Sequence, residues 1–238
     1  MATRRLFLGA LLTACGRAED EVRLHGKPGK PTGPPFPSGT TALKLRPLRD
    51  ALLYVPQSLP APAPFVLYLH GATGDEQQGI RRLTKLADEF GFILLSPASQ
   101  EITWDAIRGS FGPDVRFIDA ALSKVFAQCM IDPHKTAVCG FSDGASYALG
   151  LGLSNGGLFH RVMAFSPGFI PNGVKASGSP RFWLSHGTKD GILPIDACSR
   201  RLAPYLNREG YTVKLREFDG PHAVPPEIAR EAIEWFLK

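Results

Sequence analysis

Cysteine is scarce in this sequence, and its spacing excludes the commonest cysteine-based sites. The chain has 238 residues but only four cysteines, at positions 15, 129, 139 and 198. No two of them form a Cys-x-x-Cys motif, and none stands at a Cys/His spacing typical of zinc. We therefore expect no metal site and no cofactor. The three cysteines beyond Cys15 are odd in number, so at least one is unpaired within the chain.

Long apolar runs and long basic runs are also missing. The apolar stretch that follows Arg4 and Arg5 has about nine residues, too few for a membrane-spanning helix of about 20. The formal net charge of +5 comes from scattered lysines and arginines, which is typical of a solvated surface and argues against a nucleic-acid partner.

The first fifteen residues have the order of a signal peptide: two arginines, an apolar stretch, then small residues. The arginine pair resembles a twin-arginine export signal, and Leu12-Thr-Ala-Cys15 resembles a bacterial lipoprotein box. That resemblance implies an exported protein in the periplasm or cell envelope, held at a membrane surface by acyl chains on Cys15. An ordinary cleaved signal and a cytoplasmic protein are the alternatives.

The remaining chain divides into a tether and one domain. Residues 16–40 are polar and rich in proline and glycine, which predicts a flexible tether. Residues 41–238 alternate short apolar runs with amphipathic stretches, such as Phe65–Leu69 and then Gly79–Phe90. This pattern predicts an α/β domain with a mainly parallel sheet covered by helices on both faces. Ligands of such sheets bind at the carboxyl ends of the strands.

The pattern Gly-x-Ser-x-Gly occurs twice, around Ser142 and around Ser154. A nucleophile elbow needs a strand, a sharp turn at the serine and then a helix. Ser142 follows the apolar run Thr136–Gly140 and precedes a helical stretch, whereas Ser154 stands in a glycine-rich loop at the end of that helix. We therefore predict that Ser142 is the nucleophile.

The segment Gly140-Phe-Ser-Asp-Gly-Ala-Ser146 resembles the elbow of the phospholipase/carboxylesterase family of α/β hydrolases, and the similarity extends over roughly residues 50–238. In this fold the acid and the base follow the nucleophile in that order. His222 lies in a Gly/Pro loop before the last helix and is the predicted base. Ser185-His-Gly-Thr-Lys-Asp190 resembles the family's acid-bearing segment, so Asp190 is the predicted acid. Asp219 is the runner-up.

The resemblance also implies an oxyanion hole. One donor is the backbone N–H of Asp143, whose side chain is expected to cap the helix. The second is expected in the loop after Phe65–Leu69, where the resembled family uses the residue after His-Gly, here Ala72.

The substrate pocket is less well defined by the sequence. Trp104 and Phe111 follow the strand Phe92–Leu95 and are expected either to line the substrate pocket or to pack the loop. Phe169 and Ile170 are similar candidates. The segment from Pro167 to Pro180 is too short for a large lid.

These observations predict a serine carboxylesterase that hydrolyses small or short-chain esters through an acyl-enzyme. A serine peptidase or amidase on the same fold is the alternative enzyme, because the three predicted side chains do not separate ester from amide cleavage. The alternative outside enzymology is an inactive, lipid-anchored binding scaffold. The sequence does not fix the oligomeric state.

Overall fold

The computed structural model of the protein describes residues 22–238. The predicted signal peptide and Cys15 lie outside these described residues. No helix within residues 22–238 is both long and apolar enough to cross a bilayer. The three cysteines that the structure describes, Cys129, Cys139 and Cys198, are buried and free.

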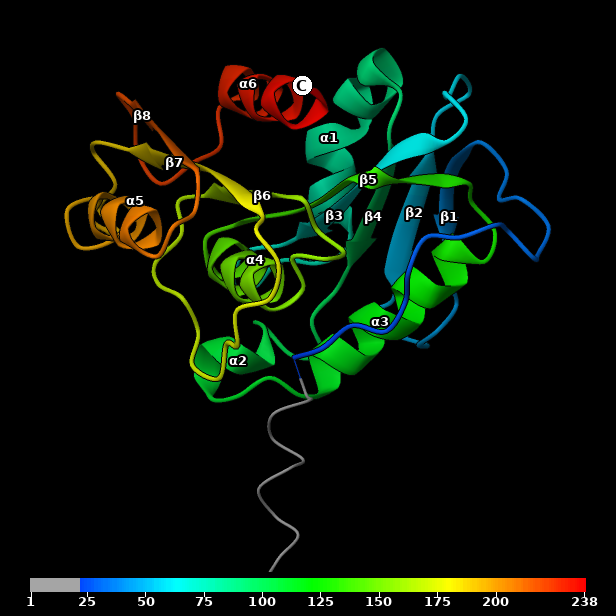
Figure 1. Ribbon diagram of the computed structural model, residues 1–238, viewed down its shortest axis with the longest axis horizontal. Coiled ribbons are helices and arrows are strands. Elements are labelled where there is room, and N and C mark those ends of the chain that lie inside the picture. The colour runs from blue at the N-terminus through cyan, green and yellow to red at the C-terminus, as the bar shows by residue number, and fades with distance from the viewer. Residues whose placement is uncertain (1–21) are drawn as a thin grey trace, which may run out of the picture.

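An eight-stranded sheet forms the centre of the molecule, in the order β1-β2-β4-β3-β5-β6-β7-β8 (Figure 1). Pairing is antiparallel for β1 with β2 and for β2 with β4, and parallel from β4 through β8. The strands are β1 (Gly39–Ala42), β2 (Ala51–Val55), β3 (Ala63–Leu69), β4 (Ile93–Pro97), β5 (Ile131–Phe141), β6 (Arg161–Phe165), β7 (Arg181–Gly187) and β8 (Val213–Phe218). The predicted mainly parallel sheet is confirmed.

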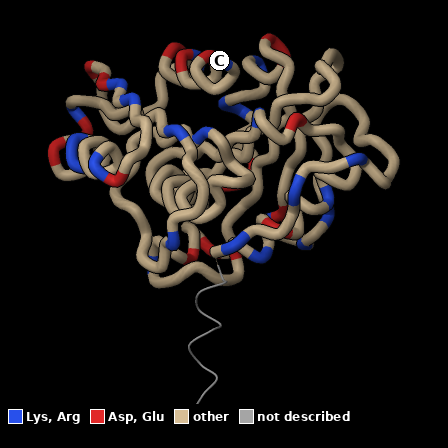
Figure 2. Tube along the Cα trace, viewed as in Figure 1, with Lys and Arg blue, Asp and Glu red and all other residues tan. Residues whose placement is uncertain are grey.

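Helices cover both faces of this sheet, as the near-continuous apolar strands require. The helices are α1 (Gln77–Phe90), α2 (Asp105–Arg108), α3 (Pro113–Phe126), α4 (Asp143–Ser154), α5 (Ser199–Arg208) and α6 (Pro226–Leu237). One apolar cluster joins α1 and α6 to one face of the sheet, and a larger cluster joins α3, α4 and α5 to the other. Helix α5 carries three arginines and no Asp or Glu, whereas α6 carries three glutamates and one arginine (Figure 2).

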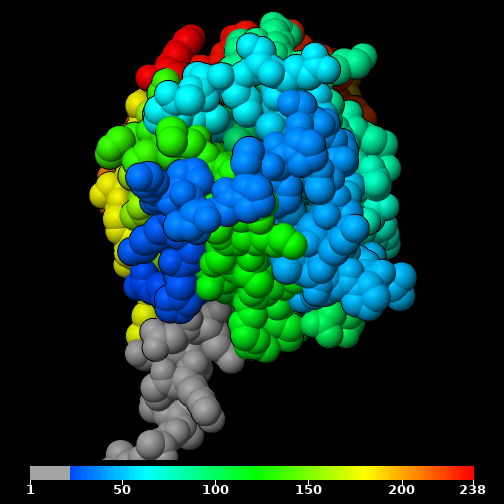
Figure 3. Space-filling view, turned by 90° about the vertical axis from the view of Figure 1, so that its right-hand side faces the viewer, coloured from blue at the N-terminus to red at the C-terminus, as the bar shows by residue number. Residues whose placement is uncertain are grey.

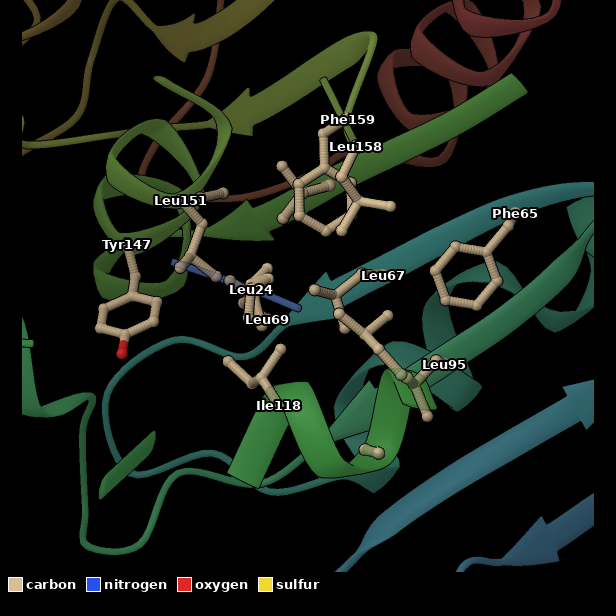
Figure 4. Close-up of a cluster of buried hydrophobic side chains, with 14 of the residues drawn as sticks. Leu24, Phe65, Leu67, Leu69, Leu95, Ile118, Tyr147, Leu151, Leu158 and Phe159 are labelled. Atoms are coloured by element: carbon tan, nitrogen blue, oxygen red, sulfur yellow. The ribbon is translucent and has the colours of Figure 1, made fainter. Parts of the chain in front are cut away.

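The segment from residue 22 to the start of β1 differs from the predicted flexible tether, because it is fastened to the domain. Val22 and Leu24 are buried, and Leu24 reaches the core cluster beside Leu69 and Leu151 (Figure 4). Asn155 accepts a hydrogen bond from the Leu24 amide and donates one to the Val22 carbonyl, each 2.9 Å long. The segment then crosses α3 on the surface (Figure 3). The proline-rich composition of this segment gave no indication that these two apolar side chains would be buried or which residues they would contact.

Candidate active site

Ser142 stands on the sharp turn between β5 and α4. Its backbone has φ 56° and ψ −120°, a sparsely populated conformation for a residue with a side chain. The flanking glycines allow this turn: a Cβ on Gly140 would lie 2.3 Å from the carbonyl oxygen of Gly144, and one on Gly144 would lie 2.2 Å from that of Leu69. Ser154, the serine of the second Gly-x-Ser-x-Gly pattern, is fully buried at the end of α4.

The loop between β8 and α6 brings His222 to Ser142. His222 Nε2 lies 2.9 Å from Ser142 Oγ, and His222 Nδ1 lies 2.5 Å from Asp190 Oδ2. Since a carboxylate only accepts hydrogen bonds, Nδ1 carries the proton and Nε2 accepts from the serine hydroxyl. The imidazole packs on the ring of Phe141, with 4.7 Å between ring centroids. Three side chains that are far apart in the sequence therefore form one hydrogen-bonded chain.

Asp190 is held as a buried anion at the end of β7. Its side chain is fully buried, and Oδ1 accepts hydrogen bonds from the amides of Ile192 and Leu193 at 2.9 and 2.8 Å. Burial by itself raises the pKa of Asp190, but the bonds from Leu193, His222 and Ile192 outweigh it and leave the pKa below its usual value. Asp219, the runner-up acid, is exposed and paired with Lys189 instead.

The loop after β3 lies directly against Ser142. A Cβ on Gly71 would be 3.4 Å from the Cβ of Ser142. The amides on either side of Ala72 are engaged, because Gly71 N–H donates to Gln78 Oε1 (3.0 Å) and Thr73 N–H donates to the carbonyl of Ile102 (2.6 Å). Ala72 itself is exposed. Gln78 is a supporting residue that the sequence did not reveal, since it lies on α1 and reaches back seven positions.

Asp143 begins α4, so its amide is one of those without an acceptor inside the helix. Its side chain does not cap the helix, contrary to expectation; Ser142 occupies the cap position. The carboxylate of Asp143 instead accepts a hydrogen bond of 2.6 Å from the hydroxyl of Thr103. This bond ties the start of α4 to the loop after β4.

Trp104 and Phe111 are placed in the loop interior and do not line an open pocket. Their exposed fractions are 0% and 4%. Trp104 Nε1 donates a hydrogen bond of 2.8 Å to the carbonyl of His70, and its ring packs between His70 and Tyr147. Phe111 packs on Tyr147. Both side chains therefore pack the loop, and neither is exposed for contact with a substrate.

Two carboxylates, those of buried Asp114 and half-buried Asp105, hold the same loop. Asp114 accepts hydrogen bonds from the amides of Gln100 (2.7 Å) and Asp105 (2.9 Å), and Gly112 occupies the cap position of α3. Asp105 returns the contact by accepting from the Asp114 amide, 2.8 Å away. Burial raises the pKa of Asp114.

His70 is buried as well. Its Nε2 accepts a hydrogen bond of 2.9 Å from the Ser99 amide, and burial lowers the pKa of His70 to about 4.

Exposed apolar side chains occur on three loops at this end of the sheet. Ile102 follows β4, Phe169 follows β6 and Ile192 follows β7, with exposed fractions of 64%, 43% and 71%. Two of these loops are attached to the site. The carbonyl of Ile102 accepts a hydrogen bond from the amide of Thr73 in the loop of Ala72, and the Ile192 amide donates to Asp190. Phe169 was a candidate from the sequence, whereas Ile102 and Ile192 were missed because isolated exposed residues carry no periodic pattern.

Comparison with known proteins points to one family. The family described as Phospholipase/Carboxylesterase matches residues 95–238. A probable feruloyl esterase C of Aspergillus niger is 27% identical over 205 residues, which is 82% of this chain and 72% of that protein. A probable feruloyl esterase C of Aspergillus clavatus is 31% identical over 105 residues. The matched residues make up 44% of this chain but only 37% of the length of that protein.

The fold is shared with solved esterase structures. The crystal structure of esterase PE8 superposes with a TM-score of 0.65 at 20% identity, covering 84% of this chain and 98% of that one. At this identity the likeness establishes the fold alone.

Proposed function

The chain belongs to the phospholipase/carboxylesterase family of α/β hydrolases, and on this premise we propose that it is a serine carboxylesterase with Ser142 as nucleophile, His222 as base and Asp190 as acid. The observation that carries the proposal is the continuous hydrogen-bonded chain from Ser142 Oγ through His222 to Asp190, with links of 2.9 and 2.5 Å. A serine hydroxyl becomes an effective nucleophile only when a positioned base takes its proton.

The reaction has two steps. Ser142 Oγ attacks the ester carbonyl while His222 Nε2 takes the hydroxyl proton, and that proton then passes to the leaving alcohol. A water molecule replaces the alcohol, gives a proton to His222 and attacks the acyl group on Ser142. The tetrahedral adduct collapses, the acid product leaves, and the proton returns to Ser142. Asp190 stays ionised throughout and stabilises the imidazolium.

We assign the oxyanion hole to the backbone amides of Asp143 and Ala72. Asp143 supplies an N–H at the start of α4, where the helix dipole favours negative charge. Ala72 lies on the loop that packs against Ser142. Each such donor is worth about 10²–10³ in turnover. The hydrogen bonds to Gln78, Ile102 and Trp104 keep this loop in place before the substrate arrives.

We propose small or short-chain esters as substrates. The segment between β6 and β7 holds no helix that could act as a lid, and the predicted pocket residues Trp104 and Phe111 are buried. Contact with the substrate is left to the exposed Ile102, Phe169 and Ile192. We propose that these side chains form an apolar rim that favours a compact acyl group over a long chain.

Feruloyl esters are the second candidate. Two relatives are named as probable feruloyl esterases, and a flat aromatic acyl group suits an apolar rim better than a closed tunnel. Hydrolysis of methyl ferulate at a rate close to that of an acetyl ester would favour this candidate. A serine amidase would instead cleave the matching anilide.

Labelling with a fluorophosphonate probe tests the nucleophile. We expect the probe to modify Ser142, and Ser142→Ala to abolish both labelling and ester hydrolysis, while Ser154→Ala keeps both. A chain that hydrolyses no ester and takes no label would be the inactive scaffold. Label on any other residue would overturn the assignment. A panel of nitrophenyl esters with increasing acyl length tests the substrate class, and faster cleavage of long chains would contradict it.

We also propose that Cys15 is lipidated and that the protein is exported to the bacterial cell envelope. The proposal rests on the sequence Leu12-Thr-Ala-Cys15 after an arginine pair and an apolar stretch. Cells fed an alkynyl fatty acid should incorporate it into the protein, and Cys15→Ser should lose the label and leave the membrane fraction. Unchanged membrane attachment of Cys15→Ser would refute the anchor.

A further inference from the structure

A second buried histidine touches the predicted acid. His186, fully buried on β7, has its Nε2 atom 3.1 Å from Asp190 Oδ2 and 2.7 Å from the carbonyl oxygen of Leu193. Its Nδ1 atom lies 2.7 Å from the hydroxyl of Ser199 at the start of α5. His186 and His222 therefore contact the same oxygen of Asp190.

The partners of His186 fix its proton. The Leu193 carbonyl and the Asp190 carboxylate only accept hydrogen bonds, so Nε2 must carry the proton. Burial lowers the pKa of His186 and favours the neutral ring. In the neutral ring Nδ1 is the acceptor, and the Ser199 hydroxyl donates to it.

We propose that His186 is a positioning residue that extends the Ser142–His222–Asp190 chain inward, with Ser199 fixing its tautomer so that its N–H holds the Asp190 carboxylate and the following loop in place. This inference rests on the proposed function. The rings of His222 and His186 both contact Oδ2 of Asp190. The amides of Ile192 and Leu193 donate hydrogen bonds to Oδ1. The Leu193 carbonyl is fixed by the same histidine N–H, so one group sets both the carboxylate and its loop.

Other charged and titratable groups surround His186. His222 contacts the same Asp190 oxygen. Glu217 on β8, which is paired with Arg200 of α5, lies in register beside His186. Cys198 is buried next to Ser199, and burial raises the pKa of its thiol, so it stays neutral at neutral pH. Asp190 is the charge in direct contact.

His186→Leu removes the donor, and His186→Gln keeps an N–H on a side chain of similar reach. The expected consequence concerns the acid limb of the rate profile. In the wild type, Oδ2 lies 2.5 Å from His222 Nδ1 and 3.1 Å from His186 Nε2. Without His186, the carboxylate charge acts on His222 alone and stabilises its imidazolium more strongly. We expect His186→Leu to lower the plateau of kcat/KM roughly tenfold and to move the acid limb upward by roughly half a pH unit. His186→Gln should restore the limb.

Ser199→Ala tests the tautomer, because without the hydroxyl the proton is no longer confined to Nε2. We expect a smaller upward movement of the same limb. Ser185→Ala is the matched control: it removes a buried hydroxyl without a hydrogen-bond partner from the same strand, β7, and should leave the limb where it is.

Two readouts are measured for every variant from about pH 5 to 9: kcat/KM for nitrophenyl acetate and the rate of fluorophosphonate labelling. A lower plateau with an unmoved limb in His186→Leu would mean a merely structural role and would overturn the proposal. So would a His186→Gln variant that behaves like His186→Leu. If His186→Leu does not fold, the other two variants carry the test. His186→Gln should leave the acid limb unmoved, and Ser199→Ala should move it upward. An unmoved limb in Ser199→Ala would then overturn the proposal. A wild type that takes no label at Ser142 would instead refute the proposed function.

Discussion

Replacing Trp104 with phenylalanine separates its two predicted roles. The indole N–H donates to the carbonyl of His70, the residue that opens the loop of Ala72. Phenylalanine keeps an aromatic ring between His70 and Tyr147 but cannot donate. If Trp104 supports this loop, the substitution should lower stability and slow all esters by a similar factor.

The size of the effect follows from the contacts. The lost hydrogen bond leaves a buried carbonyl without a partner, which costs about 1–3 kcal/mol. The smaller ring leaves a void of about 40 Å³, which adds about 1 kcal/mol at roughly 24 cal/mol per Å³. We therefore expect a loss of about 2–4 kcal/mol in the free energy of unfolding. Partial displacement of one of the proposed oxyanion donors should cost roughly tenfold to a hundredfold in kcat, less than its complete removal.

Trp183→Phe is the matched control, because Trp183 is equally buried but its indole nitrogen has no hydrogen-bond partner. It should show the void alone and keep full activity. The assays are urea unfolding and kcat/KM on nitrophenyl esters of increasing acyl length. A Trp104→Phe variant with unchanged stability, or one that slows only some acyl lengths, would place this side chain against the substrate and refute the reasoning.

Two further predictions concern packing and pH. A Cβ on Gly144 would lie 2.2 Å from the backbone oxygen of Leu69, so Gly144→Ala should prevent stable folding. Gly157→Ala is the control, because nothing lies within 4 Å of a Cβ there, and it should leave the melting temperature nearly unchanged. Equal melting temperatures for the two variants would contradict this prediction. Burial lowers the pKa of His70 to about 4, so between about pH 6.5 and 4 the unfolded chain binds a proton that the native state does not, and stability should fall with pH by up to about 3 kcal/mol. Burial also lowers the pKa of His186, which adds to this loss of stability. Urea midpoints measured at both ends of the pH window should show the loss, and His70→Gln should make it smaller.

The sequence predicted the parts of the site that depend on local motifs. A strand, a tight Gly-x-Ser-x-Gly turn and a helix determine one another, so Ser142 and the sheet around it could be inferred. Asp190 and His222 each follow a strand, and parallel strands bring such residues to one edge. The order of Ser142, Asp190 and His222 along the chain therefore predicted that their side chains lie close together.

The sequence did not reveal which way side chains turn in irregular loops. Trp104 and Phe111 stand at the correct edge of the sheet, but their burial depends on Tyr147 of α4, and no periodic pattern in the loop records that contact. Likewise, the contact of His186 with Asp190 depends on how far the loop between them folds back. Pairings of this kind are set by tertiary structure.

The fastened N-terminal segment changes where the folding unit begins. A chain shortened to start at residue 41 would lose Val22 and Leu24 from the core and leave Asn155 without the two backbone partners that it binds there. Fresh apolar surface on α3 and α4 would then face water, which favours self-association over a soluble monomer. Recombinant versions that begin at residue 22 or earlier should therefore stay dispersed at concentrations where the shorter chain precipitates.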